Sequence, residues 1–267
     1  MTITARYADP AATLHVTSEI VTLQLAHRSV RRFTPRPVTD DELAALVAAA
    51  QSASTSSNLQ AWSVVAVRDP QRKARLAALA GNQRFIDQAP LFLIWVADLS
   101  RVHRLADAAG TGGVPEGTDY LESTILGFVD AALAAQNAVV AAESLGLGTV
   151  FVGAVRNRPE QIAAELGLPP HAAAAFGLAV GTPDPAEHAG IKPRLPQGAV
   201  LHHERYDAAA ADAHIPAYDE RLGAYNARHG LPGTWSERVL ARLAGPQSLS
   251  GRHRLREALA NLGLPSR

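Results

Sequence analysis

Residues 119–155, "DYLESTILGFVDAALAAQNAVVAAESLGLGTVFVGAV", hold a long and regular apolar pattern. Alanine is frequent there and apolar residues cover much of a helix circumference, so the pattern predicts one central, closely packed helix over residues 119–145. Gly146 and Gly148 are typical of a helix end. The apolar run "TVFVGAV" (149–155) then predicts a strand, so a buried helix leads directly into a buried sheet.

Apolar runs elsewhere predict three further strands, at residues 62–67, 91–97 and 175–181. The first two are too continuously apolar for a sheet with one face in water, so we expect helices on both faces. Thr39 and Glu42 have the spacing of a capping box and predict the start of a helix. The fold class that follows is α+β (mixed α/β), with helices covering a central sheet.

The composition excludes several classes of function. Lys and Arg number 25, Asp and Glu also number 25, and the sequence pI is about 7.2, which argues against binding to nucleic acid or to a membrane surface. The chain has no cysteine, which excludes a disulfide, a thiolate nucleophile and a cysteine-ligated metal. The apolar stretch 125–142 is interrupted by polar residues, and the N-terminal residues lack the apolar core of a signal peptide, so we expect a cytoplasmic protein.

Familiar catalytic and nucleotide-binding motifs are missing from the sequence. It contains no GxxxxGK[ST] phosphate loop, no HExxH and no GxSxG. The glycines of "GLGTVFVG" (146–153) precede a strand instead of following one, so they are not a dinucleotide fingerprint. His202 and His203 are adjacent and point to opposite faces of an extended chain, so we expect no metal site.

Four polar clusters remain, and the first three each have two interpretations. "HRSVRRF" (27–33) offers arginine forks and a hydroxyl that suit phosphate oxygens, or else it is a solvated cationic helix end. "SASTSSNLQAW" (52–62) suits the edge of a flat heterocycle, or is an ordinary loop. In "IKPRLP" (191–196) an extended backbone would place Lys192 and Arg194 on one side, either around an anion or in solvent. "GNQRF" (81–85) is a weak signal by itself.

In combination and order, these segments resemble the nitroreductase family, in particular its oxygen-insensitive NADPH nitroreductase and NADPH–flavin oxidoreductase subgroup. The most specific part is "QNAVVAAESLGLGTVFVGAVRN" (136–157) followed by "IKPRLP"; "FGLAVGTP", "YDERLGAY" and a later "TW" also match. The resemblance implies a nitroreductase-like central sheet flanked by helices, in a homodimer whose domains interlock. It implies an FMN-binding core over residues 1–206 and a helical C-terminal extension over residues 207–267 that packs on the core and on the partner subunit.

The resemblance also implies a bound FMN. It places cations around the FMN phosphate, Arg31 at the pyrimidine end of the flavin, and the serine run on the flavin of the other subunit. The FMN contacts it assigns are His27, Arg28, Ser29, Arg31, Ser54, Thr55, Ser56, Ser57, Gln83, Val152, Gly153, Ala154, Lys192 and Arg194.

The implied chemistry needs no catalytic side chain, because a hydride passes from NADPH or NADH to flavin N5 and then to a second, small-molecule substrate. Asn58, Phe151 and Arg228 would meet the acceptor or the nicotinamide donor. The resemblance implies arginines for strong NADPH preference in the stretch "HGLPG" (229–233) and near Gly245 and Pro246, and they are missing there, so use of NADH becomes an alternative to NADPH.

The activity implied is ping-pong reduction of nitroaromatics, quinones or flavins. Two alternatives stay open. One is a flavin reductase that uses FMN as a dissociable substrate and supplies a partner enzyme. The other is a flavin-binding module without turnover.

Overall fold

The computed structural model describes residues 3–110, 113 and 115–267. The backbone forms two compact units, and each is made of segments that are distant in the sequence. Unit 1 comprises Met1–Arg28 and Gly190–Leu249, and unit 2 comprises Ser29–Ala189 and Ser250–Arg267. The units change over along the chain at 28/29, 189/190 and 249/250, because residues near the N-terminus pack with the segment that follows Gly190; the division expected between residues 206 and 207 stays a prediction.

Unit 2 is built on a four-stranded antiparallel sheet in the order β1-β2-β4-β3. The strands are β1 (Trp62–Val67), β2 (Leu91–Asp98), β3 (Gly148–Val152) and β4 (Ala172–Gly181). The predicted bounds of β1 are confirmed, and β4 begins three residues before the predicted start, with alanines whose low strand propensity conceals them.

The prediction for β3 was wrong at its end. The strand stops at Val152, and Gly153–Asn157 form a 3-10 turn, η3, in place of the expected strand residues. Val155 is fully buried within that turn, so the apolar pattern continues beyond the last paired residue. Apolar sequence alone does not distinguish a buried turn from a buried strand.

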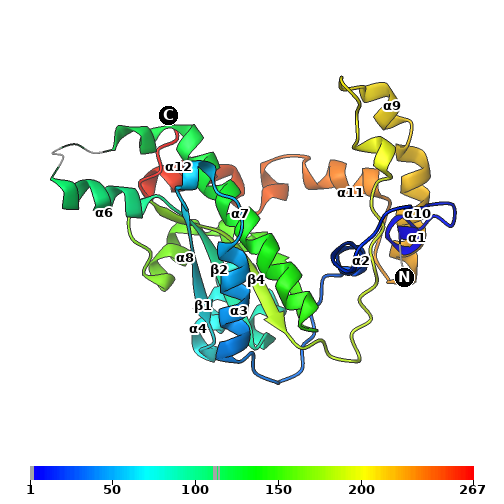
Figure 1. Cartoon of the computed structure of the whole chain (residues 1–267), viewed down its shortest axis with the longest axis horizontal. Helices are drawn as coiled ribbons and strands as arrows, with labels where there is room; N and C mark the ends of the chain where they lie inside the picture. Colours follow the sequence, from blue (N-terminus) through cyan, green and yellow to red (C-terminus); the bar gives the residue numbers. More distant parts are fainter. Residues whose placement is uncertain (1–2, 111–112, 114) are drawn as a thin grey trace. The chain divides into compact units, whose positions relative to one another are not determined.

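Both faces of the sheet are covered, as the continuous apolar runs predict. Along β2, the side chains Leu91, Leu93 and Trp95 join one buried cluster, while Phe92, Ile94 and Val96 join the other. Helices α3 (Asp40–Gln51) and α7 (Leu121–Ser144) contribute to the first cluster (Figure 1). Helices α4 (Pro70–Leu79), α5 (Arg84–Gln88) and α8 (Pro159–Leu166) contribute to the second.

Helix α7 is the central helix that the sequence predicts, with its small residues toward the sheet. A Cβ on Gly127 would lie 3.2 Å from the Cβ of Ala97, so glycine permits close approach to β2. By length and composition α7 resembles a membrane-spanning helix, but its alanine-rich side is part of the buried core, as in a core helix of a globular protein. Its opposite side exposes Leu121, Ile125, Val129 and Leu133, which are spaced four residues apart.

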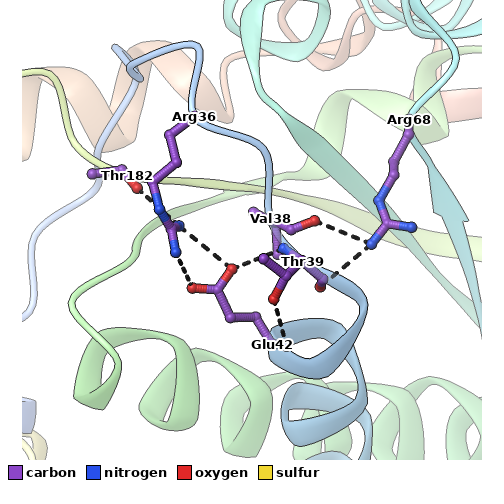
Figure 2. A network of polar contacts seen from close by, with 6 residues as sticks. All are labelled: Arg36, Val38, Thr39, Glu42, Arg68 and Thr182. Atoms are coloured by element: carbon purple, nitrogen blue, oxygen red, sulfur yellow. Dashed lines mark hydrogen bonds and ion pairs between the residues drawn. The ribbon is translucent and has the colours of Figure 1, made fainter.

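The start of α3 confirms the predicted capping box (Figure 2). The Glu42 N–H donates to Thr39 Oγ1 at 3.1 Å, and the Thr39 N–H donates to Glu42 Oε2 at 2.8 Å. Arg36 forms an ion pair with the same carboxylate at 2.6 Å and also donates to Thr182, which directly follows β4. Arg68, just after β1, donates to the carbonyls of Val38 and Thr39. The network therefore fixes the entry of α3 to the ends of two strands.

Unit 2 also contains shorter elements and a second contribution from the last residues of the sequence. These elements are η1 (Ser56–Asn58), α6 (Ser100–Ala109), η2 (Glu116–Asp119), η6 (Arg252–Arg254) and α12 (Leu255–Asn261).

Unit 1 is helical, with α10 at its centre. Tyr218, Leu222 and Tyr225 of α10 form a small buried cluster, and Leu195 and Trp235 pack against it. The Tyr218 hydroxyl donates to the Pro193 carbonyl at 3.0 Å, which holds the extended segment 190–196 against α10. The elements of unit 1 are α1 (Ile3–Tyr7), α2 (Glu19–Ala26), η4 (Gln197–Ala199), α9 (Ala208–Asp212), α10 (Ile215–Arg228), α11 (Trp235–Arg242) and η5 (Pro246–Leu249).

Candidate functional site

In unit 1, the cations assigned to a phosphate come from two segments. His27 ends α2, where its N–H donates to the Gln24 carbonyl, and Arg28 follows it. Lys192 and Arg194 lie in the extended segment, where the Lys192 ammonium is 5.9 Å from the centre of the Tyr225 ring. The Arg194 guanidinium donates to the Lys192 carbonyl at 3.1 Å.

Arg6, which was not among the predicted site residues, connects these two segments. Its guanidinium donates to the carbonyls of His27 at 2.5 Å and Lys192 at 2.9 Å, and its own carbonyl accepts from the Arg194 N–H at 2.9 Å. The residue is only 7% exposed. One arginine in a five-residue helix has no periodicity or motif, so only the folded chain reveals the connection.

In unit 2, the strand-like segment that begins at Ser29 lies beside β3. Ser29 forms a parallel bridge with Thr149, and the Val30 N–H donates to the Thr149 carbonyl at 2.9 Å. A Cβ on Gly148 would lie 2.8 Å from Val30, so this close approach requires glycine. Two segments that the sequence separates by more than a hundred residues, Ser29–Arg31 and β3, are thereby brought together.

The turn after β3 carries Gly153 and Ala154 and lies among guanidinium groups. A Cβ on Gly153 would lie 3.2 Å from Arg156 Nη2 and 3.7 Å from Arg252 Nη1. Arg252, which follows Gly245 and Pro246 in the sequence, was not among the predicted site residues. The only signal was the cationic stretch "GRHR" (251–254), and nothing in the sequence connects it with Gly153.

Gln83 precedes α5 and lies in a turn that packs beside η3. Gly81 and Asn82 both have positive φ, and a Cβ on Gly81 would lie 3.4 Å from the Asn157 amide nitrogen. The guanidinium carbon of Arg31 lies 6.0 Å from the centre of the ring of Phe85, which belongs to α5. Unit 2 therefore gathers Arg31, the Gln83 turn and the Gly153 turn.

A cavity of about 530 Å³ lies between the Gly81–Asn82 turn, η3 and the start of α12. Arg156, Arg158 and Arg254 line it together with Asn157. The buried side-chain oxygen of Asn157 has no hydrogen-bond partner among the residues that the structure describes.

Residues 54–57, the serine run, form an exposed loop that is hydrogen-bonded to Asp130 of α7. Asp130 is 1% exposed and accepts from the Thr55 hydroxyl at 2.5 Å, from the Ser56 N–H at 3.2 Å and from the Ala61 N–H at 3.0 Å. Thr55 Oγ1 in turn accepts from the Gln60 N–H. The Thr55 hydroxyl is thus engaged within the loop, whereas the side chains of Ser54, Ser56 and Ser57 are exposed.

This loop has an unusual backbone. Ser57, Asn58 and Gln60 all have φ near +50°, a region that residues other than glycine seldom occupy. Strained backbone of this kind concentrates at functional sites and persists where the surroundings enforce it. Asp130 supplies the enforcing contacts, yet in the sequence it stands only as an interruption of an apolar run.

The residues expected to meet the donor or acceptor lie in different units. Asn58 is exposed in the serine loop, and Phe151 of β3 is 40% exposed while its ring packs edge-on against Phe176. Arg228 ends α10 in unit 1 and lines a cavity of about 660 Å³ together with Asp9 and His229.

Family models and known relatives match most of the chain. Residues 25–182 match the nitroreductase family model, and residues 192–267 match the model of the nitroreductase family C-terminal domain. The chain is 39% identical to the NADPH-flavin oxidoreductase of Vibrio harveyi over 224 residues, which covers 83% of this chain and 89% of that protein. It is 40% identical over 222 residues to the FMN reductase (NADPH) of Bacillus subtilis, covering 81% and 88% of the two proteins.

A solved structure has the same fold. The NADPH:FMN oxidoreductase of Vibrio harveyi complexed with NAD+ superimposes with a TM-score of 0.82 at 37% identity, over 94% of this chain and all of that one. Family models that match most of the residues, relatives of this identity and a shared fold lead to one conclusion: the chain belongs to the nitroreductase family.

Proposed function

We propose that this protein is an FMN-dependent NAD(P)H oxidoreductase that passes two electrons to small acceptors such as nitroaromatics, quinones or flavins. The observation that carries the proposal is the pairing of Ser29 and Val30 with Thr149 of β3, whose end leads into the Gly153 turn. This pairing gathers in unit 2 the residues assigned to the flavin ring. The names of the relatives, an FMN reductase and an NADPH-flavin oxidoreductase, support the same chemistry.

The chemistry of unit 1 fits the phosphate of FMN, which carries close to two negative charges. His27, Arg28, Lys192 and Arg194 provide the cations, and arginine forks bind phosphate oxygens well. The main-chain oxygens of His27 and Lys192 would repel a phosphate, but both are bonded to Arg6. The segments therefore offer an anion mainly positive groups.

The chemistry of unit 2 fits the flavin ring. Gly153 carries no side chain, so a flat ring can approach the backbone there. The Gln83 amide suits the polar edge of the ring, and the Arg31 cation suits its pyrimidine end, where reduction places negative charge. When bound, the flavin supplies reversible two-electron transfer. The protein residues bind it, orient the donor and acceptor above it and stabilise its charge.

We further propose a homodimer that forms through α7. Leu121, Ile125, Val129 and Leu133 are large, exposed and aligned along one side of the helix, as in a contact with a second copy. Asp130 of the same helix holds the serine loop, so Ser54, Thr55, Ser56 and Ser57 lie beside this face and would serve the partner's flavin. The helical residues 207–267 would pack over the core and the partner subunit.

Arg228 would bind the nicotinamide donor, while Asn58 and Phe151 would border the acceptor. Because "HGLPG" (229–233) has no guanidinium for a 2′-phosphate, we propose that the enzyme accepts NADH as well as NADPH. We propose that the enzyme acts on small molecules in the cytoplasm and binds neither nucleic acids nor membranes.

Use of FMN as a dissociable substrate is the second candidate, since one relative is named an FMN reductase. An anaerobic absorbance spectrum of the purified protein, before and after NADPH or NADH is added, distinguishes the candidates. We expect a flavin spectrum that either donor bleaches. A colourless protein that oxidises NAD(P)H only with added FMN would favour the dissociable-flavin reductase. A yellow protein that neither donor bleaches would refute the oxidoreductase and leave a flavin-binding module.

A further inference from the structure

Arg6 lies outside the part of the chain that the family models match, which begins at residue 25. It is nevertheless among the most buried charged residues of unit 1. Burying a guanidinium is unfavourable unless its donors are satisfied. The contacts of Arg6 therefore indicate what the N-terminal segment does for the rest of the unit.

The guanidinium of Arg6 bonds three main-chain carbonyls. It donates to Leu25 and His27, which end α2, and to Lys192 in the extended segment. The Leu25 and His27 carbonyls lie at the helix C-terminus, where carbonyls lack intrahelical donors and a cation is favourable. A planar fork with five donors can join carbonyls from different segments, which an ammonium group does less well.

The Arg6 carbonyl adds a fourth connection, because it accepts from the Arg194 N–H. The backbone positions of three of the four cations assigned to the phosphate, His27, Lys192 and Arg194, thus depend on one residue. Arg28 follows His27 directly in the chain.

We propose that Arg6 is a positioning residue for phosphate recognition. Through its bonds to main-chain carbonyls, it holds the His27 and Lys192–Arg194 segments at the spacing that the FMN phosphate needs. This role rests on the proposed function. The residue would not touch the cofactor, and its effect would be specific to flavins that carry a phosphate. Loss of the fork would let the two segments separate and would release carbonyl oxygens toward the anion.

Titration of the flavin-free protein with FMN and with riboflavin, followed by flavin fluorescence, tests this role. Arg6→Met removes the charge and the donors but retains the length of the side chain. We expect its Kd for FMN to rise about 10- to 100-fold, as for loss of charge-assisted hydrogen bonds, and its Kd for riboflavin to stay within about twofold. Arg6→Lys, which keeps the charge but not the fork, should give an intermediate loss and decides the matter if Arg6→Met does not fold.

Arg221→Met is the matched control. Arg221 forms an ion pair with Asp9 of the same N-terminal segment at 2.8 Å. Among the described residues, its side chain donates no hydrogen bond to the carbonyls of His27 or Lys192. We expect unchanged affinity for both flavins. Equal weakening of FMN and riboflavin by Arg6→Met, or no weakening of FMN, would overturn the positioning role while the wild type still binds FMN. A wild-type protein that binds neither flavin refutes the proposed function, and the role of Arg6 with it.

Discussion

The carboxylate of Asp130 accepts a hydrogen bond from the hydroxyl of Thr55 at 2.5 Å, across 75 positions of sequence. The same carboxylate accepts from the main chain on both sides of the strained loop, at Ser56 and Ala61. A buried charge that receives three donors is stabilised by them and in return fixes their positions. The shape of the serine loop is therefore determined by a helix of the core.

Replacing Asp130 should loosen the serine loop more than any other part of the chain. We expect Asp130→Asn to lower the free energy of unfolding by about 1.5–3 kcal/mol, because a charged acceptor is lost. Amide hydrogen exchange of residues 54–61 should become faster. Asp98→Asn is the control: Asp98 is also buried and accepts from Ser63 and Ser100, so it should destabilise without faster exchange in this loop. Equal exchange in the two variants would contradict the assignment.

Gly153→Ala tests the approach of the flavin ring to the turn after β3. The added methyl would lie 3.2 Å from Arg156 Nη2, so the Arg156 guanidinium, whose Nη1 donates to the Ala175 carbonyl, has to shift by a few tenths of an ångström. We expect the melting temperature to change little and the Kd for FMN to rise about tenfold, about 1.4 kcal/mol, because the methyl occupies space against the ring. Gly117→Ala, where a Cβ meets nothing within 4 Å, should leave both quantities unchanged. Normal FMN affinity in Gly153→Ala would place the ring elsewhere.

Val129→Glu tests the dimer contact on α7. A carboxylate in the middle of an apolar contact is costly to bury, so we expect a folded monomer by light scattering coupled to size-exclusion chromatography. Leu105→Glu, an exposed apolar residue of α6, should remain dimeric. A dimer that survives Val129→Glu would exclude this stripe as the contact.

The capping network of α3 should make stability depend on pH in acid. Hydrogen bonds from Arg36, and then from the Thr39 backbone, hold the pKa of Glu42 below its usual value. Because the folded pKa is lowered, this stabilisation is present above about pH 4.5 and is lost as the pH falls through the folded pKa. We expect Glu42→Gln to cost about 0.5–1.5 kcal/mol at pH 7 in paired thermal melts, and this cost should fall as the pH is lowered below about 4.5. A pH-independent difference would mean that the charge of Glu42 contributes nothing.

Sequence predicts what depends on local pattern and misses what depends on distant contacts. The capping box at Thr39 and Glu42 and the bounds of β1 are confirmed, because spacing and strand-forming residues determine them. The end of β3 was wrong because Val155 is equally apolar in a buried turn.

The candidate site shows the same distinction more sharply. Gly153 and Lys192 belong to recognisable motifs, but Arg6, Asp130 and Arg252 do not. Each of these three acts through a segment far away in the sequence, and the partners become neighbours only when the chain folds. The positive φ angles of the serine loop are held by its contacts with Asp130, and the sequence does not predict them because no glycine stands at these positions.

The interleaved composition of the two units has a consequence for synthesis on the ribosome. All four strands of unit 2 are made before residue 190, yet the unit also needs residues 250–267, where the Leu262 carbonyl accepts from His171 and the Arg267 N–H donates to Asp119. Unit 2 therefore stays incomplete, although its sheet has been made, while the second segment of unit 1 is synthesised. Unit 1 in turn joins residues near the N-terminus to residues 190–249, and the bonds of Arg6 to Lys192 and Arg194 form only after that second segment has been made. Contacts of such long range are slow to form, so vectorial synthesis favours completion of unit 1 before unit 2, although most of unit 2 is translated earlier.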